Sequence, residues 1–293
     1  METLAIIILI VYSLSLLFIF SYSLIQLSLV VSYLRNKISL KKRKGKEEAT
    51  LSVFPLVTVQ LPVYNELYVV ERLLEQIANL NYPKDKLEIQ VLDDSTDETT
   101  EVIRRKVSDL LNRGLDVNHI RRPDRSGFKA GALAHGLTLA KGAFIAVFDS
   151  DFMPKQDFLL KTLPHFKDEK VGVVQTRWEH INKNYSLITK LQAFGLDAHF
   201  TIEQTGRNAA GHLINFNGTA GIWRKSCIMD AGGWQSDTLT EDLDLSYRAQ
   251  LRGWKFIYCE TIGTPAELPV AMNALKNQQF RWNKGAAECV KKN

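Results

Sequence analysis

The chain has 293 residues, of which 45% are hydrophobic and 24% charged, and its formal net charge is +5. This composition excludes a disordered, a collagen-like and a disulfide-scaffold protein, and the length allows one or two domains. The three cysteines are widely spaced and form no Cys-x-x-Cys pair, which favours a reducing compartment over a zinc or disulfide framework.

The first 34 residues predict a transmembrane helix. No charged residue occurs from Thr3 to Leu34, a run of 32 positions dominated by Ile, Leu, Val and Phe. At about 1.5 Å per residue this run is longer than the roughly 30 Å hydrocarbon core of a bilayer. A cleaved secretory signal is disfavoured, because Glu2 is the only charge before the run and no small-residue cleavage site follows it. We therefore expect a single-pass N-terminal anchor over residues 1–34.

Residues 35–54 predict a basic juxtamembrane linker. The first 50 residues carry seven basic and three acidic side chains, which accounts for +4 of the net charge of +5. Because basic flanks stay on the cytoplasmic side of a membrane, this pattern puts the N-terminus outside and the rest of the chain in the cytosol. The alternative, a merely solvated linker, would set no orientation. No basic stripe with interleaved aromatic residues recurs downstream, so we expect no nucleic-acid partner.

Residues 55–262 alternate between short β-rich runs and helical stretches, which predicts an α/β domain with βαβ crossovers and a mostly parallel sheet. The expected strands are 56–62, 87–92, 117–121, 143–148 and 171–176. The expected helices are 67–80, 98–111, 129–140 and 240–253. In such sheets ligands bind at the carboxyl ends of the strands. The last segment, 263–293, predicts an amphipathic interfacial helix over 271–290.

Acidic residues gather where two of these strands end. Asp149 and Asp151 follow a buried strand, and alternate carboxylates at such a place suit a hard divalent cation, Mg²⁺ or Mn²⁺. They could equally form a turn in which Asp bonds its own backbone. Asp93 and Asp94 follow another strand and could accept hydrogen bonds from a base or a ribose, or cap the next helix.

Two further motifs precede helices. Residues 125–131 put two cations and two glycines ahead of a helix, which suits a diphosphate at the helix N-terminus, although a surface turn is the alternative. Thr240 is a suitable N-cap and Glu241 a suitable first-turn acid. Asp242 is left to act as a general base for a hydroxyl nucleophile.

The last motif, Gln278 with Arg281 and Trp282, lies in the C-terminal helical segment. A tryptophan ring can hold the face of a sugar, and an arginine can bind phosphate with two hydrogen bonds. The alternative is a helix anchored at lipid headgroups by its tryptophan.

Together with the segment 62–66, the ordered set of motifs resembles the processive, inverting family 2 glycosyltransferases, which include cellulose, hyaluronan and chitin synthases. The resemblance extends from about residue 50 to the end of the chain. The segments 174–178 and 216–221 make it most similar to cellulose-synthase-like enzymes that produce β-1,4-mannan or glucan backbones. It implies a Rossmann-like glycosyltransferase A fold.

The resemblance, with the residue analysis above, implies a role for each motif. Asp242 is the expected catalytic base, and Asp149 and Asp151 are the expected ligands of Mg²⁺ or Mn²⁺, with Asp151 the more direct one. The expected nucleotide-sugar site consists of Tyr64, Glu66, Asp93, Asp94, Lys129, Asp149 and Arg281. The expected acceptor site consists of Phe216, Asn217, Gly218, Gln278 and Trp282.

The expected reaction is a single displacement that moves a hexose from UDP-glucose or GDP-mannose to a hydroxyl of a growing β-linked polysaccharide. The alternative is a non-processive transfer to a lipid acceptor, as in the ceramide glucosyltransferases. An inactive nucleotide-sugar-binding module is disfavoured, because all the acids are present together.

The family resemblance also implies membrane helices after Trp282 that form an export channel. The sequence ends 11 residues after Trp282. We therefore expect either a fragment of a longer protein or a separate channel-forming membrane subunit, and no translocation by this chain alone.

Overall fold

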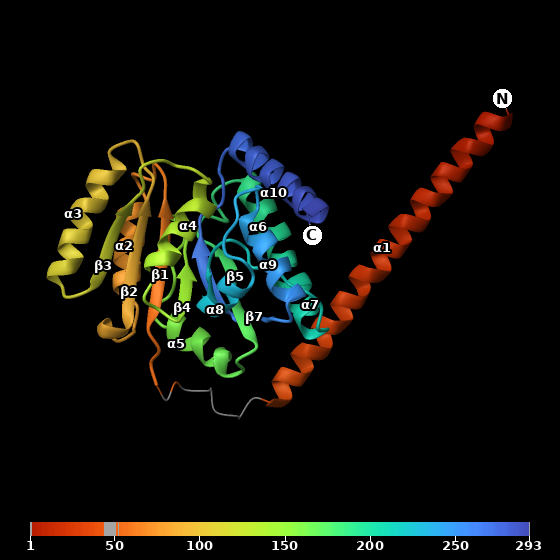
Figure 1. Ribbon diagram of the computed structural model, residues 1–293. Helices are drawn as coiled ribbons and strands as arrows, with labels where there is room; N and C mark the ends of the chain where they lie inside the picture. Colours follow the sequence, from red (N-terminus) through yellow and green to blue (C-terminus); the bar gives the residue numbers. More distant parts are fainter. Residues whose placement is uncertain (1, 44–50, 52, 293) are drawn as a thin grey trace.

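The computed structural model describes residues 2–43, 51 and 53–292, and it consists of a long N-terminal helix beside an α/β domain (Figure 1). Helix α1 spans Glu2–Arg43, so the first nine residues of the predicted linker 35–54 are helical. Within α1, Thr3–Ser39 is long and apolar enough to cross a membrane. Residues 44–50 and 52 of the predicted linker lie outside the described residues.

Within the described part of the chain, seven strands form one sheet in the order β3-β2-β1-β4-β6-β5-β7. Their bounds are β1 Val57–Val63, β2 Leu87–Asp93, β3 Asp116–Arg121, β4 Phe144–Val147, β5 Val171–His180, β6 Gly221–Arg224 and β7 Lys255–Ala266. Strand β6 runs antiparallel to β4 and β5, and the other neighbours pair in parallel. The predicted mostly parallel α/β fold is confirmed, and β6 and β7 are strands that the sequence analysis did not include.

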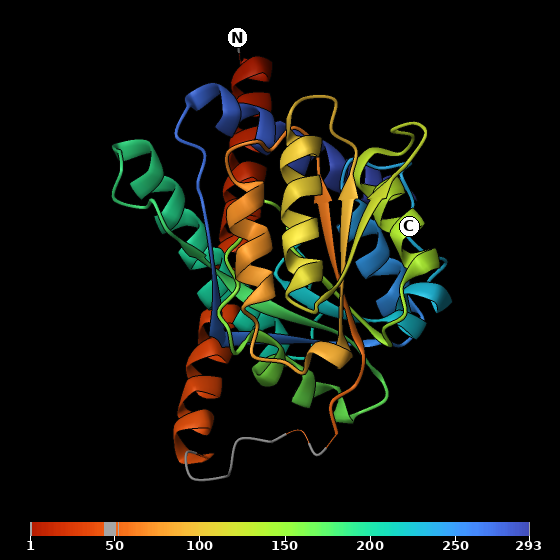
Figure 2. The same ribbon diagram turned by 90° about the vertical axis from the view of Figure 1, so that its left-hand side faces the viewer.

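Helices cover both faces of the sheet, because successive side chains of a strand point to opposite faces. In β4, Phe144 and Ala146 join the apolar cluster that also holds residues of α2, α3 and α5. Ile145 and Val147 join the cluster under α4, α8 and α9. Figure 2 shows α2 and α3 side by side on the first face. The helix bounds are α2 Val70–Ala78, α3 Thr99–Asn112, α4 Phe128–Leu139, α5 Phe158–Thr162, α6 Leu187–Ala198, α7 Thr205–Ala209, α8 Lys225–Asp230, α9 Glu241–Leu251 and α10 Met272–Lys292.

Among the described residues there are also three short helical turns, namely the 3₁₀ turns η1 (Lys84–Lys86) and η2 (Leu163–Lys167) and the π-helical η3 (His199–Gln204). The predicted domain boundary after residue 262 falls inside β7, because that strand continues to Ala266 beside β5. The predicted C-terminal helix over 271–290 corresponds closely to α10.

The C-terminal half of α1 packs against η3 and α7. Leu29 and Tyr33 of α1 are buried, and Gly206 of α7 lies so close that a Cβ there would be 2.6 Å from the Leu29 carbonyl oxygen. The Tyr33 hydroxyl donates to the Glu260 carboxylate at 3.5 Å. By contrast, the large apolar side chains of residues 4–27 are exposed, as expected for a membrane span.

Candidate active site

A cavity of about 880 Å³ lies at the carboxyl ends of β1, β4, β5 and β7, and α9 and α10 supply further walls. The structure brings twelve of the fourteen predicted site residues to its wall. They are Tyr64, Glu66, Asp94, Lys129, Asp149, Asp151, Asn217, Gly218, Asp242, Gln278, Arg281 and Trp282. Asp93 and Phe216 are not among the lining residues. The motifs spread over more than 200 residues of sequence thus converge on one site.

Lys129, in the first turn of α4, lies at the centre of this site. Its Nζ donates to Asp149 Oδ1 at 2.5 Å and to the Gly218 carbonyl oxygen at 3.0 Å. Burial acts to lower the pKa of this amine, but the charges of Asp149, Glu241 and Asp242 outweigh burial and raise the pKa to about 12. Lys129 therefore carries a positive charge in the cavity, which can neutralise a diphosphate.

Asp149 and Asp151 lie directly after β4 and both line the cavity. Burial, followed by the charge of Asp149, raises the pKa of Asp151 to about 7. Among the residues that the structure describes, no group of three or more His, Cys, Asp or Glu side chains could hold a metal ion. Two carboxylates, completed by phosphate and water oxygens, nevertheless suit Mg²⁺ or Mn²⁺. The donor set fits a cation that binds together with a phosphorylated substrate.

Asp242 lies in the first turn of α9 with its carboxylate beside Gly218. Its Oδ1 accepts a hydrogen bond from the Leu243 amide at 2.9 Å. Burial, followed by the charge of Glu241, raises the pKa of Asp242 to about 7, while Lys129 acts in the opposite direction. A carboxylate with such a pKa is suited to general-base catalysis near neutral pH.

Asp93 lies behind the cavity wall and its side chain is fully buried. It accepts a hydrogen bond from the Ser95 amide at 2.8 Å, and its Oδ2 is 2.9 Å from His119 Nε2. Burial acts to raise the pKa of Asp93, but these hydrogen bonds outweigh burial and lower it to about 2. Asp94 reaches the cavity and forms an ion pair with Arg122. Of the two adjacent acids, the structure brings only Asp94 to the site.

Phe216 is part of the core and not of the cavity wall, in contrast to the acceptor-site prediction. Its ring is fully buried and packs on Trp223 and Trp234, with ring centroids 5.4 and 6.4 Å away. The Asn217 amide donates to Gln175 Oε1 at 2.9 Å. The core position of Phe216 thus fixes where Asn217 enters the cavity.

Several lining residues were given no site role from the sequence, among them Trp178 and His180, whereas Arg125 belongs to the predicted diphosphate motif 125–131. Trp178 and His180 lie at the end of β5, and the Trp178 ring is 6.4 Å from that of Trp282. Arg125 stacks on Tyr64, with its guanidinium carbon 3.3 Å from the ring centroid. Continuing the strand 171–176 by four residues would have pointed to Trp178 and His180.

A lysine, paired aspartates and a further aspartate thus line a cavity at the carboxyl edge of a mostly parallel sheet, which is where ligands bind in open α/β folds. Residues 55–285 match the family described as Glycosyltransferase like family 2, and the chain belongs to this family. This confirms the predicted resemblance.

Named relatives refine the comparison. The chain is 42% identical over 253 residues to the probable glucomannan 4-beta-mannosyltransferase 4 of Oryza sativa subsp. japonica. This alignment covers 85% of the present chain and 46% of the relative. It is 40% identical over 246 residues to glucomannan 4-beta-mannosyltransferase 9 of Arabidopsis thaliana, over 82% of this chain and 46% of the relative. The chain spans less than half the length of these curated relatives.

The fold is also similar to that of a solved structure, the mannosyltransferase PcManGT from Pyrobaculum calidifontis in complex with GDP-Man and Mn²⁺. The TM-score is 0.70 at 22% sequence identity, over 90% of this chain and 72% of that chain. The predicted glycosyltransferase A-like fold is confirmed.

Proposed function

We propose that the protein is a membrane-anchored, inverting mannosyltransferase that extends a β-1,4-linked mannan or glucomannan with mannose from GDP-mannose. The names of the curated relatives support a polysaccharide product over the lipid acceptor of the alternative prediction. The GDP-Man in the PcManGT complex supports the donor. UDP-glucose is the second donor to test, because a glucomannan also contains glucose.

One observation carries this proposal: a base and a cation flank the same small residue in the cavity. A Cβ at Gly218 would lie 3.1 Å from Asp242 Oδ2 and 3.5 Å from Lys129 Nζ. Asp242 would take the proton of the acceptor hydroxyl as that oxygen attacks the anomeric carbon. Lys129 and Arg281 would neutralise the departing diphosphate, where negative charge develops. A single attack inverts an α-linked donor to a β-linked product.

The cation and the acceptor have their own positions in this scheme. Asp149 and Asp151 would hold Mg²⁺ or Mn²⁺, which supplies charge neutralisation at the diphosphate when bound. Asn217, Gln278 and Trp282 would hold the acceptor sugar, with the tryptophan ring against a sugar face.

The membrane arrangement is part of the same proposal. The exposed apolar surface of α1 supports a membrane span, and the basic residues that follow it in the sequence support a cytosolic catalytic domain. Export of the product through a separate channel-forming membrane subunit stays a prediction.

The proposal is tested with membranes that contain the full chain, incubated with labelled GDP-mannose or UDP-glucose. We expect label from GDP-mannose in an insoluble product that a β-mannanase releases, and no such product with Asp242→Asn. Label that appears solely in an organic-extractable monoglycosyl lipid would reject the polysaccharide function.

A further inference from the structure

In the first half of α10, one face of the helix forms part of the cavity wall. Gln278, Arg281 and Trp282 on this face line the cavity. Residues three, four and seven positions further along a helix return to the same face. In α10 these positions are Gly285, Glu288, Cys289 and Lys292. The second half of this face therefore also points toward the domain.

That second half contacts the residues just before Asp242. Gly285 is buried, and a Cβ there would lie 2.5 Å from both Cγ2 and Oγ1 of Thr240, closer than any side chain permits. The Thr240 hydroxyl lies 3.5 Å from Cys289 Sγ. The Leu239 amide donates to Glu288 Oε2 at 2.9 Å. The chain that leads into α9 is thus seated directly on α10.

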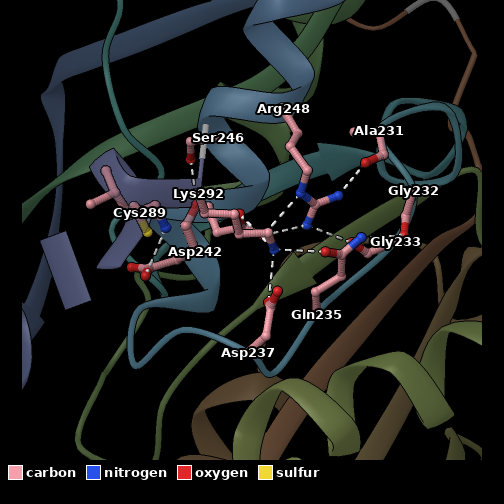
Figure 3. A network of polar contacts seen from close by, with 12 residues as sticks. Ala231, Gly232, Gly233, Gln235, Asp237, Asp242, Ser246, Arg248, Cys289 and Lys292 are labelled. Atoms are coloured by element: carbon pink, nitrogen blue, oxygen red, sulfur yellow. Dashed lines mark hydrogen bonds and ion pairs between the residues drawn. The ribbon is translucent and has the colours of Figure 1, made fainter. Parts of the chain in front are cut away.

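Lys292 closes the contact from the far end of α10 (Figure 3). Its Nζ lies 2.7 Å from Asp237 Oδ1 and 3.0 Å from Asp244 Oδ1, and it donates to Gln235 Oε1 at 2.7 Å. Asp244 is fully buried and also pairs with Arg248 at 2.7 Å. Lys292 therefore joins a residue before the base to one after it.

We propose that the second half of α10 positions the catalytic base, with Gly285 and Lys292 fixing Asp242 relative to Arg281. This inference rests on the proposed function of Asp242. Residues within three turns of one helix keep constant distances from one another. The contacts of α10 therefore hold the base Asp242 at a constant position relative to Arg281, the side chain proposed to neutralise the leaving diphosphate. Gly285 and Lys292 are positioning residues and do not touch the reacting atoms.

The test compares Lys292→Met with Lys291→Met in the full chain. Lys291 is an adjacent, exposed lysine of the same last turn, so its substitution controls for charge and for helix stability. We expect Lys292→Met to lower kcat by a factor on the order of 10 to 100, because a misplacement of about 1 Å has such an effect. The donor KM should stay within about twofold, since the charged groups at the diphosphate are intact.

Two further variants extend the comparison. Lys292→Arg should restore most of the lost kcat, because it keeps a cation within reach of Asp237 and Asp244. Gly285→Ala should also lower kcat, because its methyl group displaces Thr240. A Lys292→Met variant with wild-type kcat, or with a raised KM and an unchanged kcat, would overturn the inference.

A second measurement does not depend on activity. Amide hydrogen exchange of residues 237–243 in the substrate-free protein should be roughly tenfold faster in Lys292→Met than in Lys291→Met, because the segment loses its anchor. Equal exchange in the two variants would overturn the positioning role. If the wild-type chain transfers neither sugar, the proposed function fails, and the exchange comparison still decides whether α10 holds the segment.

Discussion

Two carboxylates at the same edge of the sheet, the buried Asp93 and the half-buried Asp242, have opposite electrostatic environments. Asp93 accepts hydrogen bonds from the Ser95 amide and His119, and its pKa falls to about 2. Asp242 is half-buried beside another acid, Glu241, and desolvation together with the charge of Glu241 raises its pKa to about 7. Asp93 is therefore ionised at every physiological pH, whereas Asp242 can gain and lose a proton near neutrality.

The difference separates two parts of the site. On the side of β2 and β3, acids are neutralised by partners within the protein, such as Arg122 for Asp94. These acids therefore have a structural role in holding this side of the site together. On the side of α9, Lys129 lowers the pKa of Asp242, but it does not fully offset the increase caused by burial and by Glu241. An acid in that state costs stability but suits proton transfer.

The sharpest break in this comparison is Asp242→Asn. We expect transfer to fall by a factor on the order of 1,000, because the amide cannot take the proton of the acceptor hydroxyl. Labelled sugar in polymer measures transfer, and a binding assay with the nucleotide diphosphate should show retained affinity. Asp109→Asn, at an exposed position on α3, is the control. Polymer synthesis by the Asp242→Asn protein would contradict the role of Asp242.

Removal of divalent metal should have the next largest effect. EDTA should lower transfer by a factor on the order of 100 or more, and Mn²⁺ or Mg²⁺ should restore it, because the leaving diphosphate loses a neutralising charge. Asp151→Asn should raise the metal concentration that gives half-maximal activity. Unchanged transfer in EDTA would remove the metal from the scheme.

The pH dependence of kcat tests the raised pKa of Asp242. Only the deprotonated carboxylate can act as a base, so kcat should fall as the pH drops below about 7. Glu241→Gln removes the neighbouring negative charge that helps to raise this pKa. The acid limb of the profile should therefore move to lower pH in the variant. A shift to higher pH would contradict the assigned cause.

Asp93→Asn should have the smallest effect on transfer and instead reduce stability. The lowered pKa of Asp93 corresponds to about 2 kcal/mol of folding free energy. This contribution is fully present above about pH 4 and is lost as the pH falls toward 2. We expect a lower melting temperature at pH 7 than for the Asp109→Asn control. A transfer defect as large as that of Asp242→Asn would break the comparison.

Strand patterns in the sequence pointed to the part of the cavity wall where residues follow buried strands, namely Glu66, Asp94, Asp149 and Asp151. The runs before Asp94 and Asp149 mark the sheet edge where ligands bind. The pattern fails where the local sequence resembles a loop: Phe216 precedes Asn217 and Gly218, yet its ring packs in the core against two tryptophans. Strand β7 contains glycine, proline and charged residues, and its pairing with β5 is irregular.

Contacts between distant segments were also outside the reach of the sequence. Thr240 and Cys289 meet across 49 positions, and neither belongs to a periodic pattern that names the other. From the sequence alone, Gly285 only indicates a position that weakens the helix. The structure shows that the absence of a side chain there makes room for Thr240. Tertiary packing, and not local preference, explains both positions.

The seat of α1 on α7 has a mechanical consequence. The covalent chain joins the domain to α1. A second connection comes from the close approach of Gly206 to Leu29 and from the hydrogen bond that Tyr33 donates to Glu260. A body attached at two points cannot swivel about a single tether. A membrane-spanning α1 would therefore hold the mouth of the cavity at a constant orientation relative to the bilayer.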